Sequence, residues 1–238
     1  MESQEKSGAI PEHIAVIMDG NRRWAKINNL PSKIGHREGA LRVTDLVRNC
    51  ADIGVRYLSV YAFSTENWKR EKKEIDYLMS LLMEFVVKEL SNLHKNDVKI
   101  TMMGNMNDLP DKTRREVLRS IELTKNNKTL HLNIALSYGS RNEIIRAVKN
   151  IINDYENNEI KIEEINEERF KKYLFTNDMP DPDLLIRTSG EIRLSNFLLY
   201  QLAYTEFYFT DVLWPDFNKE ELLKSIECYQ QRKRRYGN

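Results

Sequence analysis

Cysteine is scarce in this sequence, and its scarcity excludes two classes of small protein. The 238 residues contain 2 cysteines, Cys50 and Cys228, which lie far apart in the chain. Two isolated cysteines form neither a disulfide framework nor the paired spacing of a zinc site. We therefore expect a protein that is stabilised by a hydrophobic core and keeps its thiols reduced, as the cytoplasm does.

A surplus of charge is also missing. Lysine and arginine number 37 and aspartate and glutamate 36, so the formal net charge is +1. A general nucleic-acid binder has a basic surplus that attracts phosphate, so we expect no nucleic-acid partner. The sequence has no apolar run of the length that spans a membrane, and residues 1–12 lack the apolar core of a signal peptide. Residues 1–12 are predicted to form a flexible arm.

The glycine-rich signatures of nucleotide-binding proteins are missing as well. Neither G-x-x-x-x-G-K-[ST] nor a strand followed by G-x-G-x-x-G occurs in the sequence. The sequence therefore does not specifically indicate a nucleotide as the source of a bound phosphate.

Short apolar runs rich in β-branched residues alternate with longer helical patterns. The predicted strands are 13–18, 57–63, 98–104, 130–136, 183–187 and 205–210. The predicted helices are 36–54, 74–94, 109–127, 140–158 and 216–238. Nearly unbroken apolar strands that alternate with helices predict a parallel sheet covered on both faces. We therefore expect a single α/β domain over residues 1–238, with a mostly parallel sheet of about six strands.

One acid, Asp19, follows the first predicted strand and is followed at once by Gly20 and Asn21. In parallel sheets, ligands bind outside the carboxyl ends of the strands. A helix that starts there exposes N–H groups to a phosphate, and Arg23 can add a charge-assisted bond. Mg²⁺ between Asp19 and a diphosphate would remove the repulsion between these anions. The alternative is that Asp19 caps a helix or forms an ion pair with Arg22 or Arg23.

Other polar residues lie after the later strands or at a helix start, and each has two interpretations. Arg187, Arg193 and Ser195 surround a glycine turn that could hold a second diphosphate or be a solvated surface turn. Asn67 stands in a charged stretch that is typical of a lid and equally of a mobile loop. His36 could donate to a phosphate, or it could be structural.

The predicted helix from Ile75 to Leu90 has little polar face. A helix that covers one face of a sheet needs only an apolar stripe, so the remaining apolar side chains must contact something else. Deep burial, a partner chain and an apolar ligand are the alternatives. Together with two phosphate-like sites, this surplus favours a substrate with a charged head and an apolar tail.

Several long stretches resemble one family of enzymes. They are "HIAVIMDGNRRWAK", "GHREGA", "YAFSTENWKR", "LNIALSYGSRNEI", "DLLIRTSGEIRLSNFLLYQLAYTEFYFTDVLWPDF" and the terminal "RRYG". On these stretches the chain resembles the cis-prenyltransferases from near residue 13 to its end.

The resemblance implies sequential condensation of isopentenyl diphosphate onto an allylic diphosphate such as farnesyl diphosphate, with Mg²⁺ as cofactor and each new double bond cis. The implied product is a long-chain polyprenyl diphosphate such as undecaprenyl diphosphate, the precursor of a lipid carrier for cell-wall synthesis. A homodimer, a hydrophobic tunnel and transient contact of the product with a membrane surface are implied as well. The D-D-x-x-D signature of trans-prenyltransferases is absent, in agreement with the cis family.

The resemblance also assigns roles to individual residues. The catalytic residues would be Asp19, which also holds Mg²⁺, and Asn67, which takes part in proton removal. Glu206 would be the second metal-linked acid. The substrate-binding residues would be Gly20, Asn21, Arg22, Arg23, Trp24, Ser32, His36, Ser64, Thr65, Glu66, Trp68, Arg70, Arg187, Arg193, Leu194 and Ser195. Ala62 would line the tunnel and Leu130 would lie near its far end. Arg235 and Gly237 match the R-x-G end that reaches into the partner's site in the family's dimers.

Three residues depart from common family patterns. Arg22 stands where many bacterial members have glycine, Ser32 where an arginine is frequent, and Ile192 where some members have histidine. Two other functions stay open: a non-catalytic partner subunit of a heteromeric cis-prenyltransferase, and a lipid-diphosphate carrier without chemistry. Such a subunit could lose the acid after the first strand, so the presence of Asp19 argues against it.

Overall fold

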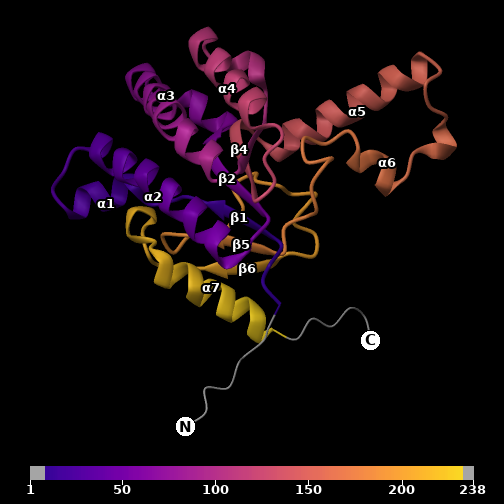
Figure 1. Cartoon of the computed structure of the whole chain (residues 1–238). Helices are drawn as coiled ribbons and strands as arrows, with labels where there is room; N and C mark the ends of the chain where they lie inside the picture. The colour runs from indigo at the N-terminus through magenta and orange to yellow at the C-terminus, as the bar shows by residue number, and fades with distance from the viewer. Residues whose placement is uncertain (1–8, 233–238) are drawn as a thin grey trace.

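The computed structural model describes residues 9–232 and shows one parallel sheet with helices on both faces (Figure 1). The elements in chain order are β1 (His13–Ile17), α1 (Asn21–Ile27), α2 (Ser32–Ile53), β2 (Tyr57–Ser64), α3 (Lys72–Lys95), β3 (Val98–Met103), α4 (Asp111–Thr124), β4 (Leu130–Tyr138), α5 (Ser140–Glu156), α6 (Glu167–Lys171), β5 (Leu184–Arg187), β6 (Glu206–Phe209) and α7 (Lys219–Gln231). The predicted α/β fold with six strands is confirmed.

The strand order β3-β4-β2-β1-β5-β6 places β1 inside the sheet, between β2 and β5. All five strand pairings are parallel, and Ile17 lies level with Tyr61 of β2 and Arg187 of β5. The chain leaves β1 toward β2 on one side and later returns to β5 on the other. Such a switch point leaves a crevice at the carboxyl ends of the strands, where ligands bind.

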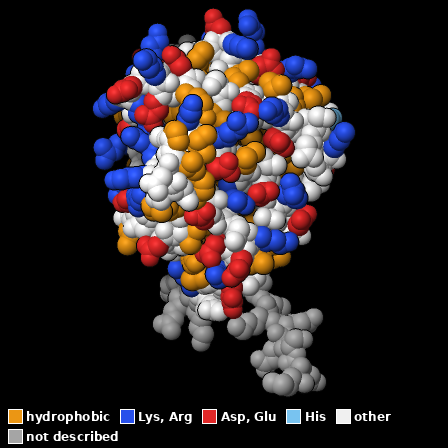
Figure 2. Space-filling view, turned by 90° about the vertical axis from the view of Figure 1, so that its left-hand side faces the viewer, with side chains coloured by type: hydrophobic (Ala, Val, Ile, Leu, Met, Phe, Trp, Pro, Cys, Tyr) orange, Lys and Arg blue, Asp and Glu red, His pale blue; other side chains and the backbone are white. Residues whose placement is uncertain are grey.

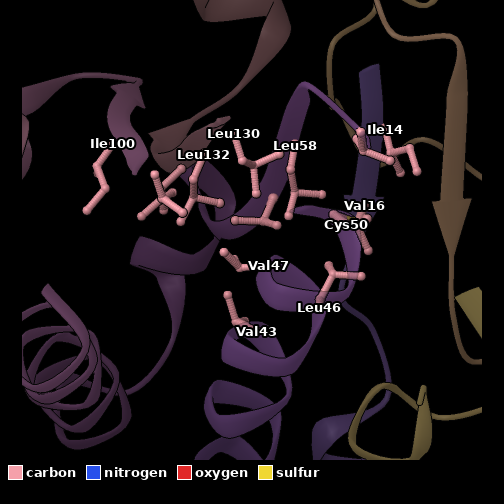
Figure 3. Close-up of a cluster of buried hydrophobic side chains, with 14 of the residues drawn as sticks. Ile14, Val16, Val43, Leu46, Val47, Cys50, Leu58, Ile100, Leu130 and Leu132 are labelled. Atoms are coloured by element: carbon pink, nitrogen blue, oxygen red, sulfur yellow. The ribbon is translucent and has the colours of Figure 1, made fainter. Parts of the chain in front are cut away.

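Two apolar clusters fill the two sides of the sheet. The larger joins strand residues such as Ile14, Val16 and Leu58 to α2, α3, α4 and α7, and Figure 3 shows part of it packed against Val43 and Val47 of α2. The smaller lies on the other face, where Ala15 and its neighbours pack against residues from the segment 194–202. Alternate residues of β1 thus belong to different clusters, as the pleat of a strand requires.

The start and the end of the described chain differ from the predicted arm and the predicted last helix. Residues 1–8 of the predicted arm lie outside the described residues, whereas Glu12 is tied to the sheet by its N–H, which donates to Asp183 Oδ2 at 2.8 Å. The last predicted helix ends earlier than expected, at Gln231, within the described range. No helix between residues 9 and 232 is long and apolar enough to cross a membrane.

Candidate active site

A polar pocket lies at the carboxyl ends of β1, β2 and β5, as the switch-point rule predicts. Its empty volume, including the part open to solvent, is about 1240 Å³. The lining residues are Ile17, Met18, Asp19, Asn21, His36, Tyr61, Ala62, Ser64, Glu66, Asn67, Arg70, Leu78, Arg187, Ser195 and Asn196. Most of the polar ones are sequence-predicted site residues that come from four separate stretches of the chain.

Asp19 is held at the floor of this pocket by Arg187. The guanidinium donates to Asp19 Oδ2 at 2.9 Å and to Ser195 Oγ at 2.8 Å, and it also donates to the carbonyl of Arg193. The Arg187 side chain is 3% exposed, whereas that of Asp19 is 32% exposed. A buried cation therefore compensates the carboxylate, while the carboxylate stays accessible from the pocket.

The backbone around Asp19 is fixed as well. The Asp19 N–H donates to Thr188 Oγ1 at 3.0 Å, and the Thr188 hydroxyl donates to the Asp19 carbonyl at 2.6 Å. The expected alternative, an ion pair of Asp19 with Arg22 or Arg23, is not what the structure shows, because the partner is Arg187.

Gly20 has a φ of +110°, a conformation that favours glycine. A Cβ at this position would come within 3.0 Å of the Leu213 side chain and 3.1 Å of Ser189. The tight turn lets α1 start directly behind Asp19, and Asn21 then enters the pocket lining. Asn21 Oδ1 is buried and has no hydrogen-bond partner among residues 9–232.

His36 lies across the pocket in the first turns of α2. Its Nε2 is buried without a hydrogen bond to any described residue and is 3.8 Å from Glu74 Oε1. Burial, together with the cations Arg70 and Arg22, lowers the pKa of His36 to about 4, although Glu74 opposes the shift. The neutral imidazole can still donate one N–H to an anion.

The loop after β2 is ordered by a short 3₁₀ helix over Thr65–Lys69. The Ser64 N–H donates to Asn67 Oδ1 at 3.1 Å, so the amide oxygen of Asn67 serves as a cap. Trp68 Nε1 donates to Ser137 Oγ at 2.8 Å, and the Ser137 hydroxyl donates to Asp108 Oδ2 at 2.6 Å. These bonds tie the loop to the ends of β3 and β4.

Arg23 and Arg193 meet outside the pocket lining. Both are ion-paired to Glu191, whose Oε1 accepts from Arg23 at 2.7 Å, and Arg23 also donates to the Ser189 carbonyl at 2.6 Å. Hydrogen bonds from Arg23 and Arg193 lower the pKa of the Glu191 carboxyl. The two arginines therefore already share one anionic group, and a diphosphate would compete with Glu191 for them.

The remaining predicted binding residues have varied surroundings. Arg22 and Ser32 are exposed, and Leu194 packs partly buried against the smaller apolar cluster. Trp24 donates its indole N–H to Asp216 at 2.7 Å.

Arg70 is ion-paired to Glu74 at 2.8 Å within the pocket wall. Thr65 donates to its neighbour Glu66, whose Oε1 also accepts from Asn196 at 2.9 Å.

Glu206 does not lie near Asp19 in a single chain. Glu206 is the first residue of β6 and pairs with Leu184 of β5, whereas Ile17 pairs with Arg187, three residues further along β5. Glu206 and Ile17 are therefore about 10 Å or more apart along the strand direction. Its carboxylate is ion-paired to Arg232 instead. Within the described part of the chain, no group of three or more His, Cys, Asp or Glu could hold a metal ion. Arg235 and Gly237 lie outside the described residues.

An apolar cavity adjoins the polar pocket and occupies about 760 Å³, including its open part. Its lining residues are Met18, Asn21, His36, Gly39, Ala40, Val43, Val60, Tyr61, Ala62, Phe63, Leu78, Met79, Leu81, Leu82, Phe85, Ile134, Leu136 and Trp214. Six of these, namely Met18, Asn21, His36, Tyr61, Ala62 and Leu78, also line the polar pocket. The two spaces therefore adjoin each other and share these residues as a common border.

The apolar surplus of α3 is explained by this cavity. Leu78, Leu81, Leu82 and Phe85 line it and are only partly buried, so the helix turns apolar side chains toward an open space as well as toward the sheet. The hydrophobic tunnel for a growing chain stays a prediction.

Ala62 lines both spaces, but its neighbours differ from expectation. Alternation along the strand predicts that Tyr61 and Phe63 both point away from Ala62. The pairing of β2 with β4 shifts register between Tyr61 and Phe63, and Phe63 packs in the larger cluster and lines the same cavity as Ala62. An irregularity of this kind puts consecutive side chains on one face.

Leu130 is fully buried at the amino end of β4, level with Val98. It packs beside Leu132 and Leu58 (Figure 3) and does not line the cavity. Its role at the far end of a tunnel stays a prediction.

Sequence reasoning missed several polar residues that complete the site. Asp108, Asn196 and Glu191 form the bonds described above, and Tyr61 donates its hydroxyl to the Tyr138 carbonyl at 3.1 Å. Ser137 and Asn196 have φ values of +47° and +64°, which are uncommon for residues with side chains. A positive φ at a serine or an asparagine cannot be recognised in the sequence. The only signal is the position of such a residue after a strand.

Comparison with known proteins now gives the family. The profile described as "Putative undecaprenyl diphosphate synthase" matches residues 17–237. The chain belongs to this family of prenyltransferases. An isoprenyl transferase of Clostridium tetani is 52% identical over 228 residues, covering 96% of this chain and 89% of that protein. One from Fusobacterium nucleatum is also 52% identical and covers 96% of both chains.

Solved structures agree with the family assignment. Lavandulyl diphosphate synthase from Lavandula x intermedia, in complex with dimethylallyl diphosphate, superposes with a TM-score of 0.94 at 35% identity, over 96% of this chain and 99% of that one. A probable undecaprenyl diphosphate synthase from Campylobacter jejuni gives a TM-score of 0.80 at 36% identity, over 97% and 100%. The predicted resemblance is confirmed, and with it a prenyltransferase enzyme.

Proposed function

We propose that this prenyltransferase condenses isopentenyl diphosphate onto an allylic diphosphate such as farnesyl diphosphate, with cis geometry at each new double bond. The product is a long-chain polyprenyl diphosphate such as undecaprenyl diphosphate, the precursor of a lipid carrier for cell-wall synthesis. The observation behind this proposal is that a polar pocket and an apolar cavity adjoin each other and share six lining residues. The two spaces fit the charged head and the apolar tail of one substrate.

The reaction needs charge stabilisation more than acid or base groups. The C–O bond of the allylic diphosphate breaks and diphosphate leaves with the electron pair. The double bond of isopentenyl diphosphate then attacks the allylic carbon, and a proton leaves to form the new double bond. Asn21 and His36 hold the allylic diphosphate, and Arg187 with Ser195 holds the isopentenyl diphosphate. Fixed donors of this kind stabilise the developing negative charge without reorganisation.

The described residues fit one Mg²⁺ held jointly with substrate, not a cage made only of protein. Mg²⁺ commonly uses one or two carboxylates together with phosphate oxygens. Asp19 is partly exposed in the pocket and could supply one of them. Bound there, Mg²⁺ would neutralise charge on the leaving diphosphate. Glu206 could take part only through a second chain, because its own chain holds it away from Asp19.

Asn67 acts in proton removal by position and not as a base. A neutral amide is a poor base, and its oxygen already accepts the Ser64 N–H. Its NH₂ group is the part left to orient a water molecule or a phosphate oxygen that takes the proton.

A homodimer is part of the proposal, and α5 supports it. Ile145, Val148, Ile152 and Tyr155 are 56%, 40%, 50% and 47% exposed. Their three-four-three spacing places them on one side of the helix, in the pattern by which two helices pack together. A second copy would cover this stripe. The reduced cysteines Cys50 and Cys228 suit the proposed cytoplasmic location.

Dimerisation can be tested on α5 directly. Ile152→Arg should shift the mass measured by light scattering from dimer to monomer, because it places a charge inside the contact. Leu123→Arg on α4, where the leucine is 46% exposed, is the matched control and should leave the mass unchanged. An unchanged dimer in the Ile152→Arg variant would exclude this stripe as the contact.

The activity is tested with the purified full chain, radiolabelled isopentenyl diphosphate, farnesyl diphosphate and Mg²⁺. Label should enter butanol-extractable polyprenyl diphosphates, and chelation of the metal should stop incorporation. No incorporation by the chain alone, with activity restored by another subunit, would support the non-catalytic partner. Binding of polyprenyl diphosphate without any incorporation would support the carrier.

A further inference from the structure

The turn between α1 and α2 exposes apolar side chains at its end. Ile27 is 68% exposed and Leu30 is 41% exposed. The turn is closed by its own backbone, since the Leu30 N–H donates to the Ala25 carbonyl at 2.8 Å and the Asn29 N–H to the Lys26 carbonyl at 3.1 Å. An ordered turn therefore holds two apolar side chains in solvent, where they contribute little to the core. We call residues 26–30 the α1–α2 tip.

The stretch of chain that contains this tip is basic. Residues 20–37 contain no aspartate or glutamate and include the cations Arg22, Arg23, Lys26, Lys33 and Arg37. Arg23 and Arg37 are ion-paired to Glu191 and Glu84. The other three have no ion pair with any residue between 9 and 232. This concentration contrasts with the near-neutral charge of the chain as a whole.

The tip joins the two helices that border the substrate spaces. Asn21 at the start of α1 and His36 near the start of α2 line both the polar pocket and the apolar cavity, and the tip joins these two helices. Figure 2 faces the side on which α1 and α2 lie in Figure 1 and shows hydrophobic side chains exposed among basic and acidic ones. The helix α5 lies on the opposite side, so a dimer formed through it leaves the tip free.

We propose that the α1–α2 tip docks the protein on an anionic phospholipid surface. Ile27 and Leu30 enter the interface between headgroups and acyl chains, while Lys26 and Lys33 contact the anionic headgroups. The turn has no concave surface into which a partner protein could insert a helix or a strand. A lipid surface is therefore the partner that suits it better. The proposal rests on the proposed function, since a long polyprenyl product is apolar and has to pass from the protein to a lipid phase.

The expected size of the effect follows from the charges and the apolar side chains. Each lysine or arginine near an anionic surface strengthens binding roughly fivefold. The triple variant Lys26→Glu/Ile27→Ser/Leu30→Ser reverses one charge and removes both apolar contacts, so vesicle binding should fall by at least about tenfold. The matched control is Arg115→Glu/Leu118→Ser/Leu123→Ser on α4, where both leucines are about half exposed.

The experiment is co-sedimentation of the full chain with vesicles of phosphatidylcholine alone or mixed with phosphatidylglycerol. The wild type and the α4 variant should bind the mixed vesicles, the tip variant should not, and added salt should weaken binding. Equal loss in both variants, equal binding to both kinds of vesicle, or no binding by the wild type would overturn the proposal. Turnover in detergent without vesicles should be equal in all three proteins. Absence of turnover by the wild type in detergent would count against the proposed function and not against the docking surface.

Discussion

The polar pocket and the apolar cavity meet at Ala62 and His36, yet they are built in different ways. The pocket is assembled from loops after three strands, and its side chains are fixed by an ion pair and hydrogen bonds. The cavity is walled by α2, α3 and the sheet, and its shape depends on packing. Changes in the pocket should therefore alter rate, and changes in the cavity should alter which products form.

The two regions also use small residues differently. In the pocket, Gly20 is needed because its φ is +110° and neighbouring atoms lie close. In the cavity, Gly39, Ala40 and Ala62 leave space open. Gly39 adds a further constraint, because a Cβ there would come within 2.2 Å of Asn21 Oδ1. The packing of α2 on α1 thus sets the boundary between the two regions.

The largest expected effect is in the pocket. Asp19→Ala should lower turnover on the order of a thousandfold, because a charge contact that acts in the transition state is lost. Arg187 keeps two other acceptors, Ser195 Oγ and the Arg193 carbonyl, so the fold and diphosphate binding should persist, with a lower free energy of unfolding because the buried cation loses its anionic partner. Steady-state kinetics and circular dichroism on the same sample check both parts. Near-normal turnover would remove Asp19 from the chemistry.

A smaller effect tests how far the cavity reaches. Leu130→Ala should lower the free energy of unfolding by about 2–5 kcal/mol, because the side chain is fully buried. If the growing chain extends to this end of β4, the same variant should give longer products. Denaturant unfolding and product chromatography measure the two effects. A loss of stability with unchanged chain lengths would assign Leu130 to the core alone.

The smallest effect concerns pH. Burial lowers the pKa values of His13, His36 and His131 to about 4, from an unfolded value of 6.5. Between these values the unfolded chain binds protons that the folded chain does not, so stability is retained above pH 6.5 and falls as the pH drops toward 4. Each histidine contributes at most about 1.4 kcal/mol per pH unit.

Two glutamine variants distinguish a buried histidine that is remote from the pocket from one that lines it. His13→Gln, remote from the pocket, should reduce the pH slope of unfolding and leave diphosphate affinity unchanged. His36→Gln should reduce the slope and weaken diphosphate binding as well. Unfolding curves from pH 7 to pH 4 and calorimetric titration with an allylic diphosphate would show this. An identical slope in both variants and the wild type would contradict the pKa argument.

The fold could be predicted from the sequence because its strands are apolar runs that contrast sharply with the helices between them. The position of Asp19 followed from the rule for parallel sheets, since the residue after a strand reaches the ligand edge. The surplus of apolar residues in α3 predicted only that some of these side chains contact more than the sheet, and the structure shows that several of them line the apolar cavity.

The partners of these residues could not be predicted in the same way. The ion pair of Asp19 with Arg187 joins residues 168 positions apart, and it depends on β1 and β5 being neighbours. The shared Glu191 and the register shift at Tyr61 depend on local backbone geometry that spacing does not encode. The separation of Glu206 from Asp19 appears only once the register of β6 is known.

The measurement that tests the division between the two regions most directly uses Ala62→Leu. A larger side chain should block the cavity near its junction with the pocket, and each added isoprene unit buries about five carbons, roughly 3–4 kcal/mol. Single-turnover kinetics of the first condensation and chromatography of the final products are run on the same sample. We expect a first condensation close to the wild-type rate and clearly shorter products. A uniformly slower enzyme with unchanged chain lengths, and about 1–3 kcal/mol less stability from overpacking, would contradict it.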